Sequence, residues 1–224
     1  MNMPRPLIAP ASATSRARLG AAALAAAGVL FLLYPLVRPW ADETTMDGAR
    51  AMASAAWVAS HLFAMVGFIL VSLGLLSLHL VLDRRLTLPA VVVTWLGAGL
   101  TLPYYGAEDF GLNAIAARAV REQDASLIDL VDQFRYAPAA VAMFAVGLAL
   151  LGVGAVIAAV AVWRSGVLSR WSAIPLAAGF ALFIPQFFGT PAMRIAHGVL
   201  MAIGGLWLAA ELWRAGRVHG GPAR

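Results

Sequence analysis

Two adjacent carboxylic acids, Glu108 and Asp109, stand in the most chemically distinctive segment of an otherwise apolar chain. They follow Tyr104 and Tyr105 in the sequence. On a helix, residues four apart share a face, so each acid lies beneath one of these rings. A carboxylic acid desolvated by aromatic rings can be held protonated near neutral pH and then donate that proton. The spacing predicts Glu108 as a proton donor with Asp109 as its partner. The alternative is that both acids only mark the boundary with water.

A second pair of polar residues, Arg194 and His197, begins a later apolar stretch. Because they are three residues apart, they present two donors on one helical face. We expect them to pair with Glu108 or Asp109 and to position the acid. The alternative is a structural ion pair that only closes the helix bundle.

His61 is a candidate for carrying the same proton, since histidine has an ordinary pKa near neutrality. It follows Trp57 by four residues, which places an indole beside the imidazole. His61 and His197 at similar depth could also hold one haem. The sequence has no Cys, no second histidine pair and no metal-binding motif, so we predict neither a metal site nor a cofactor.

Aromatic and polar side chains expected in the outer half of the membrane form the predicted substrate-binding set. Aromatic rings there would stabilise positive charge in a lipophilic substrate. The set consists of Trp57, Trp95, Tyr104, Tyr105, Gln186, Phe187, Arg194 and His197.

The composition indicates an integral membrane protein. Of 224 residues, 62% are hydrophobic and only 12% are charged, which excludes an ordinary soluble domain. The net charge of +5 is the difference between 16 basic and 11 acidic residues, and every basic residue counted is arginine, because the sequence contains no lysine. We therefore assign the basic residues to membrane topology and predict no nucleic-acid partner. The lack of Cys excludes disulfides and thiolate metal sites.

A spanning helix needs about 20 apolar residues, and no alternating pattern typical of a membrane strand occurs. The sequence therefore predicts an all-α polytopic membrane bundle with six transmembrane helices. The six apolar stretches are Leu19 to Val37, Ala51 to Leu82, Leu86 to Ala107, Tyr136 to Trp163, Trp171 to Met193 and Ile195 to Ala210.

Arginine in short loops is retained on the cytoplasmic side of a membrane. Ten arginines lie before the first stretch, between alternate stretches or after the last, whereas nine of the eleven acids lie in the opposite connections. Both termini are therefore predicted to be cytoplasmic.

The predicted organisation is one domain with two tails. Residues 1–15 are rich in Pro, Ala and Ser and are predicted to be a disordered tail. Residues 16–215 form the single six-helix domain, and residues 216–224 form a C-terminal tail. Residues 113–135 have helical apolar spacing and are expected to form an amphipathic segment on the outer membrane surface.

The pattern formed by residues 34–39, Trp57 to His61, residues 104–113 and residues 194–198 resembles a family of six-span membrane proteins from high-GC actinobacteria. This resemblance implies the bacterial inner (cytoplasmic) membrane and supplies no activity. In size, span number and an acid within an aromatic membrane pocket, the chain is also distantly similar to the small integral-membrane terpene cyclases. That similarity is an analogy and implies protonation of an alkene or epoxide followed by cyclisation.

The expected function is that of a membrane-embedded enzyme that cyclises or isomerises a lipophilic, isoprenoid-type substrate by acid catalysis. Its expected partners are that small molecule and the lipid bilayer, and no oligomeric state is predicted. The alternative is a proton-coupled transporter or small-molecule-binding protein that uses the same polar cluster. A third interpretation is a structural subunit whose polar residues only join helices.

Overall fold

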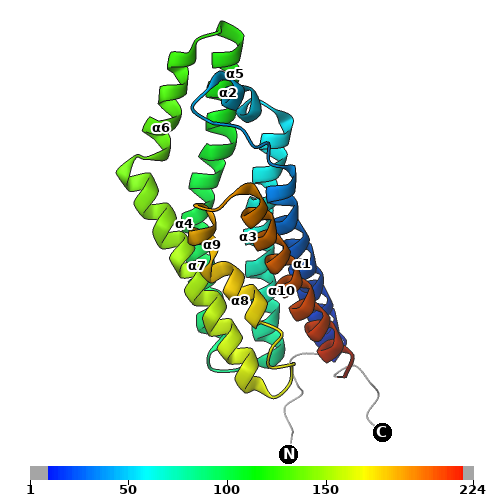
Figure 1. Ribbon diagram of the computed structural model, residues 1–224. Coiled ribbons are helices and arrows are strands. Elements are labelled where there is room, and N and C mark those ends of the chain that lie inside the picture. Colours follow the sequence, from blue (N-terminus) through cyan, green and yellow to red (C-terminus); the bar gives the residue numbers. More distant parts are fainter. Residues whose placement is uncertain (1–9, 219–224) are drawn as a thin grey trace, which may run out of the picture.

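The computed structural model describes residues 10–218, which form an elongated all-helical bundle (Figure 1). Residues 1–9 and 219–224 of the predicted tails lie outside the described residues, and the first helix begins at Pro10. No strand occurs within residues 10–218, so the all-α class is confirmed. The five long helices are α1 (Pro10–Val37), α3 (Ala55–Leu82), α4 (Thr87–Gly106), α7 (Pro138–Ser165) and α10 (Pro191–Val218).

Within residues 10–218, five helical segments are long and apolar enough to cross a membrane, which supports a multi-pass membrane protein. They are Thr14–Val37, Ala55–Leu82, Thr87–Glu122, Pro138–Ser165 and Pro191–Arg217.

The predicted span over residues 171–193 is not one helix. It contains α8 (Ile174–Ala181) and the short α9 (Phe183–Gln186), which are separated at Leu182. Proline has no amide N–H and its ring collides with the carbonyl four residues earlier. Pro185 therefore prevents the helical hydrogen bond to Ala181 and accounts for the break.

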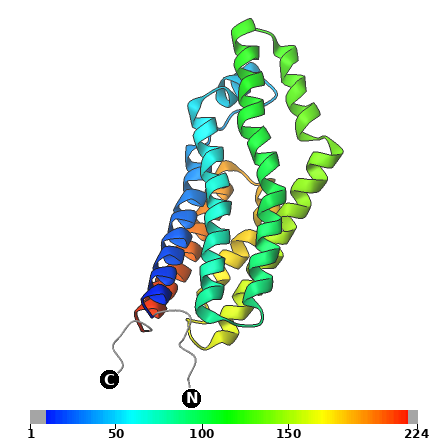
Figure 2. The same cartoon turned by 180° about the vertical axis from the view of Figure 1, so that it is seen from behind.

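The helical segments pack side by side around a closed ring. α1 contacts α10 and α3, α4 contacts α3 and α7, and α8 joins α7 to α10 (Figures 1 and 2). Aromatic side chains fill part of the interior of this ring. Among them, Phe68 contacts Phe31, Tyr105 and Phe183, with ring centroids 5.1 to 5.4 Å apart. Phe68 therefore joins aromatic side chains of α1, α4 and α9 in one packed cluster.

The arginine-rich ends of these helices gather at one end of the bundle. Thr14 Oγ1 donates to the Gly216 carbonyl at 3.1 Å, which joins the described ends of α1 and α10. The Arg84 guanidinium donates to the Ser165 carbonyl at 3.4 Å, which joins the α3–α4 connection to the end of α7.

The opposite end carries a small helical cap. It consists of α2 (Met46–Met52), α5 (Leu112–Glu122), the 3-10 helix η2 (Ala125–Ile128) and α6 (Asp129–Arg135). A π-helical turn, η1 (Ala107–Gly111), joins α4 to α5, so the chain rises as one helical rod into the cap (Figure 2). This 36-residue rod is about 54 Å long, well beyond a hydrocarbon core of about 30 Å.

The cap has a hydrophobic core of its own. The predicted amphipathic segment, residues 113–135, is largely helical, and several of its apolar side chains pack against other residues of the cap. The buried cluster consists of Ala49, Met52, Trp57, Leu112, Ala116, Ala119, Ile128 and Val131. Trp57 comes from the first turn of α3, so the cap core is continuous with the bundle.

Close backbone contacts hold the bundle together at several glycines, including Gly204 of α10. A Cβ at this position would overlap the backbone of Leu176 in α8. We expect Gly204→Ala to lower the free energy of unfolding by about 1–3 kcal/mol. Thermal unfolding in detergent measures this loss. Gly99→Ala is the matched control, because a Cβ there meets no atom within 4 Å. Equal stability of the two variants would contradict the α8–α10 contact.

Candidate functional site

Four charged side chains form a connected ion-pair network where the cap meets the bundle. The guanidinium of Arg135 donates to both oxygens of Glu108, with Nε–Oε1 at 2.7 Å and Nη2–Oε2 at 3.0 Å. Its Nη1 lies 2.8 Å from Glu43 Oε2, and Glu43 Oε1 accepts from Arg38 at 2.5 Å. The network therefore runs from Arg38 through Glu43 and Arg135 to Glu108.

Each member of the network comes from a different segment. Arg38 follows α1, Glu43 lies in the connection to α2, Glu108 is in η1 and Arg135 ends α6. Exposure of these four side chains is 9%, 24%, 11% and 16%. Removing one partner from such a buried network leaves a charge uncompensated, so the network fixes how the segments meet.

The electrostatics of the network match its geometry. Burial alone would raise the pKa of Glu43, but Arg38 and Arg135 outweigh it and lower that pKa below its ordinary value. Burial also opposes the charge on Arg135, yet its hydrogen bonds to Glu108 raise its pKa above the ordinary value. Glu43 and Arg135 are therefore held in their charged forms.

Sequence reasoning missed Arg38, Glu43 and Arg135 as members of the site. The partners expected for Glu108 were Arg194 and His197, and the structure places Arg135 there instead. Their positions could have identified two of them. Arg38 and Arg135 lie in the connections that carry most of the acidic residues, whereas most arginines lie in the opposite connections.

Glu108 differs from the expected proton donor. Both of its oxygens accept hydrogen bonds from Arg135, which is the role of an ionised carboxylate. Its backbone carbonyl accepts from Trp57 Nε1 at 2.9 Å. The Tyr104 hydroxyl donates to the carbonyl of Arg135 at 3.1 Å, so Tyr104 supports the partner of this acid.

Asp109 has the opposite surroundings. Its side chain is fully buried at 0% exposure, and neither oxygen has a hydrogen-bond partner among the described residues. The π-helical turn that holds Asp109 and Glu108 is a rare backbone feature that is frequent at functional sites. One turn therefore presents one paired acid and one unpartnered acid.

His61 and Trp57 lie together as their spacing predicts. Their ring centroids are 4.4 Å apart, and His61 Nδ1 lies 2.8 Å from the Trp57 carbonyl oxygen. His61 is 2% exposed and also contacts the rings of Tyr34 and Tyr105, at centroid distances of 5.6 and 6.1 Å. The imidazole is thus part of the aromatic interior beneath the cap.

The predicted aromatic wall is partly assembled. Phe144 of α7, which sequence reasoning missed, stacks on Tyr104 with centroids 4.1 Å apart and contacts Tyr105 and Phe187 at 5.8 Å each. Trp95 lies elsewhere. It is 46% exposed on the outer face of α4 and lines an apolar groove between α3 and α4.

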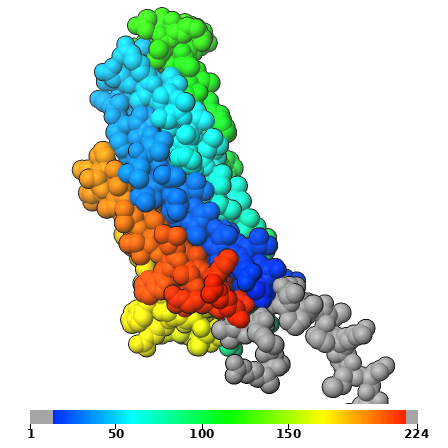
Figure 3. Space-filling model, turned by 90° about the vertical axis from the view of Figure 1, so that its right-hand side faces the viewer, coloured from blue at the N-terminus to red at the C-terminus, as the bar shows by residue number. Residues whose placement is uncertain are grey.

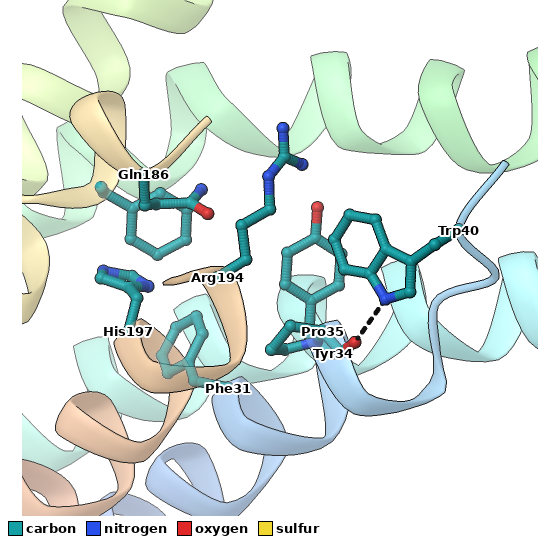
Figure 4. A pocket seen from close by; sticks show the side chains of 8 residues that line it. Phe31, Tyr34, Pro35, Trp40, Gln186, Arg194 and His197 are labelled. Atoms are coloured by element: carbon teal, nitrogen blue, oxygen red, sulfur yellow. Dashed lines mark hydrogen bonds between the residues drawn. The ribbon is translucent and has the colours of Figure 1, made fainter. Parts of the chain in front are cut away.

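The remaining predicted residues, Gln186, Arg194 and His197, line a separate small pocket with Tyr34 and Trp40 (Figure 4). The other lining residues are Phe31, Pro35 and Phe183. His197 Nε2 lies 2.8 Å from the Gly179 carbonyl oxygen, so this ring joins α10 to α8. The pocket leaves about 10 Å³ for the centre of a water-sized atom, room for about one water.

Within residues 10–218, no three His, Cys, Asp or Glu side chains form a group that could hold a metal ion. In comparisons with protein-family models, curated proteins and solved structures, no match to this chain was found. The geometry of the site is therefore the basis for assigning a function.

The lowered pKa of Glu43 gives a pH-dependent stability. A carboxylate with a lowered folded-state pKa stabilises the fold above its ordinary pKa, here 4.5, and this contribution is lost as pH falls through the lowered value. We expect the wild-type unfolding temperature to drop between about pH 5 and pH 3 and Glu43→Gln to be less stable at neutral pH with a flatter profile. Asp47→Asn, whose parent side chain is 81% exposed, should keep the wild-type profile. An unchanged profile in Glu43→Gln would contradict the network.

Proposed function

We propose that the chain crosses a bacterial cytoplasmic membrane six times, with both termini in the cytoplasm. The segment containing α8 and α9 runs beside α10 over most of its length. The Ser169 amide donates to Glu211 near one end, and Phe187 accepts from Arg194 near the other. A broken helix that covers the same depth as α10 supports the sixth crossing, and the arginine-rich end of the bundle supports the orientation.

We propose that the protein is an enzyme that isomerises or cyclises a lipophilic, isoprenoid-type substrate, with Asp109 as the acid. The observation that carries this proposal is the fully buried Asp109 carboxyl group with two unpartnered oxygens. An ionised carboxylate without partners is very costly to bury, whereas a neutral carboxylic acid is tolerated and has a proton to donate. Glu108, in contrast, is committed to Arg135.

The proposed reaction balances without a cofactor. The Asp109 O–H proton adds to one carbon of a substrate alkene, whose π electrons form the new C–H bond and leave a carbocation on the neighbouring carbon. A second alkene attacks that cation to close a ring. The Asp109 carboxylate then takes a proton from a carbon next to the new cation, which gives a neutral alkene product and restores the carboxylic acid. Tyr105 stands four residues before Asp109 and its ring contacts those of Phe68 and Phe144, so these rings would stabilise the positive charge.

Substrate access requires movement of the protein. Sites for small molecules usually enclose about 300–1,000 Å³, and the pocket beside the aromatic core leaves only about 10 Å³. The cap lies above Asp109 and is joined to the bundle through the ion-pair network. Displacement of the cap is therefore the proposed route of access, a motion common in enzymes that exclude water.

Proton-coupled transport is a second candidate. The break between α8 and α9 at Leu182 favours it, because discontinuous helices form the binding sites of many transporters. The inner half of the bundle disfavours it, because few polar side chains occur there and a transporter needs a polar route from both sides.

The test compares Asp109→Asn with Glu108→Gln in proteoliposomes that contain linear isoprenoid alkenes and epoxides in deuterated water. Acid-initiated cyclisation places one solvent deuterium in the product, which mass spectrometry detects. We expect Asp109→Asn to lower the rate about 100- to 10,000-fold, because that is the usual contribution of a general acid. Glu108→Gln should retain turnover and lose thermal stability.

Turnover that survives in Asp109→Asn and disappears in Glu108→Gln would contradict the assignment. No deuterated product from the wild type, together with a proton flux that Asp109→Asn abolishes, would favour transport.

A further inference from the structure

Two guanidinium groups contact the indole ring of Trp40, which lines the small pocket together with Arg194. The Cζ atoms of Arg38 and Arg194 each lie 5.3 Å from the centroid of the Trp40 ring. The Trp40 indole N–H donates to the Pro35 carbonyl at 3.3 Å, which fixes the ring against the end of α1 (Figure 4). The Trp40 ring is therefore in cation–π contact with two positive charges.

The two arginines differ in how their charge is compensated. Arg38 is paired with Glu43, whereas Arg194 has no carboxylate partner within 4 Å in the described part of the chain. Arg194 instead donates through Nη2 to the Phe187 carbonyl. The cluster thus has three guanidiniums, Arg38, Arg135 and Arg194, against the two network carboxylates, an excess of one positive charge.

Both arginines keep an unused donor. Arg38 Nε and Arg194 Nε are buried and have no hydrogen-bond partner among residues 10–218. An unpaired buried donor is costly, and each such group in a folded protein calls for an explanation. Two unused donors on two cations beside one ring indicate a missing anion.

The surroundings select the kind of anion. Gln186 adds a neutral polar side chain, and Arg194 lies in the first turns of α10, where the helix dipole is positive (Figure 4). Figure 3 shows the start of α10 and the preceding residues projecting from the side of the bundle. The half-exposed Trp40 matches the aromatic side chains that mark the polar boundary of a membrane.

We propose that Arg38 and Arg194 together bind a phosphate group, which a phospholipid headgroup or free phosphate would supply. The guanidinium fork fits phosphate oxygens, and charge-assisted hydrogen bonds to phosphate are among the strongest in proteins. The small pocket accommodates one oxygen atom of the group, while its ester or free side faces outward. Phosphate binding here requires no reaction at Asp109.

The experiment measures lipid binding to delipidated full-length protein in detergent by native mass spectrometry. The probes are dioleoyl phosphatidylglycerol, dioleoyl phosphatidylcholine and, in a parallel thermal-shift arm, inorganic phosphate. We expect the wild type to prefer phosphatidylglycerol and Arg194→Gln to bind it about tenfold more weakly, as expected for one lost charge-assisted contact. Arg214→Gln is the matched control, because that arginine is 68% exposed and its partner is Glu211, at the opposite end of α10.

The outcomes distinguish the source of the phosphate. A preference for phosphatidylglycerol that Arg194→Gln removes and Arg214→Gln keeps assigns the site to a lipid headgroup. Stabilisation by inorganic phosphate alone, lost in Arg194→Gln, assigns it to free phosphate. If Arg194→Gln does not fold, Arg194→Lys keeps the charge without the fork and should bind several-fold more weakly. Wild-type binding of both probes in these Arg194 variants would overturn the proposal.

Discussion

The ion-pair network between the cap and the bundle is the interaction on which the rest of the structure depends. Arg135 reaches both Glu108 and Glu43, and Glu43 reaches Arg38, so one connected set of charges joins α1, the α1–α2 connection, η1 and α6. Each charge lies where water is scarce and an unpaired ion would be costly. In this structure the network therefore fastens the cap to the bundle, and the apolar core of the cap includes Trp57 of α3.

This constraint separates two neighbouring acids that the sequence presents as equivalent. The π-helical turn holds Glu108, which pairs with Arg135, and Asp109, which is buried and has no hydrogen-bond partner among residues 10–218. Pairs of carboxyl groups whose environments differ in this way commonly divide the roles of charged stabiliser and proton donor. Buried charges need compensation, and this also applies to Arg194. No carboxylate among the described residues lies within 4 Å of its guanidinium group, which suggests an external anion.

Much of the fold could be predicted from apolar length and from the i, i+4 rule. The long helices α1, α3, α4, α7 and α10 correspond to predicted spans, and Trp57 lies beside His61 as its spacing implies. The break at Leu182 could be predicted only by giving Pro185 more weight than the continuous apolar run around it. The pairing of Arg135 with Glu108 depends on how α6 folds back onto η1, and local periodicity carries no information about that approach.

Infrared spectroscopy can show whether Asp109 is protonated while Glu108 is ionised, because the C=O stretching band of a protonated carboxyl group is distinct from the bands of a carboxylate. We predict that the wild type shows the band of a protonated carboxyl group at neutral pH. Glu108→Gln should keep this band, and Asp109→Asn should lose it. A band that disappears in Glu108→Gln and persists in Asp109→Asn would contradict the division of roles between the two acids.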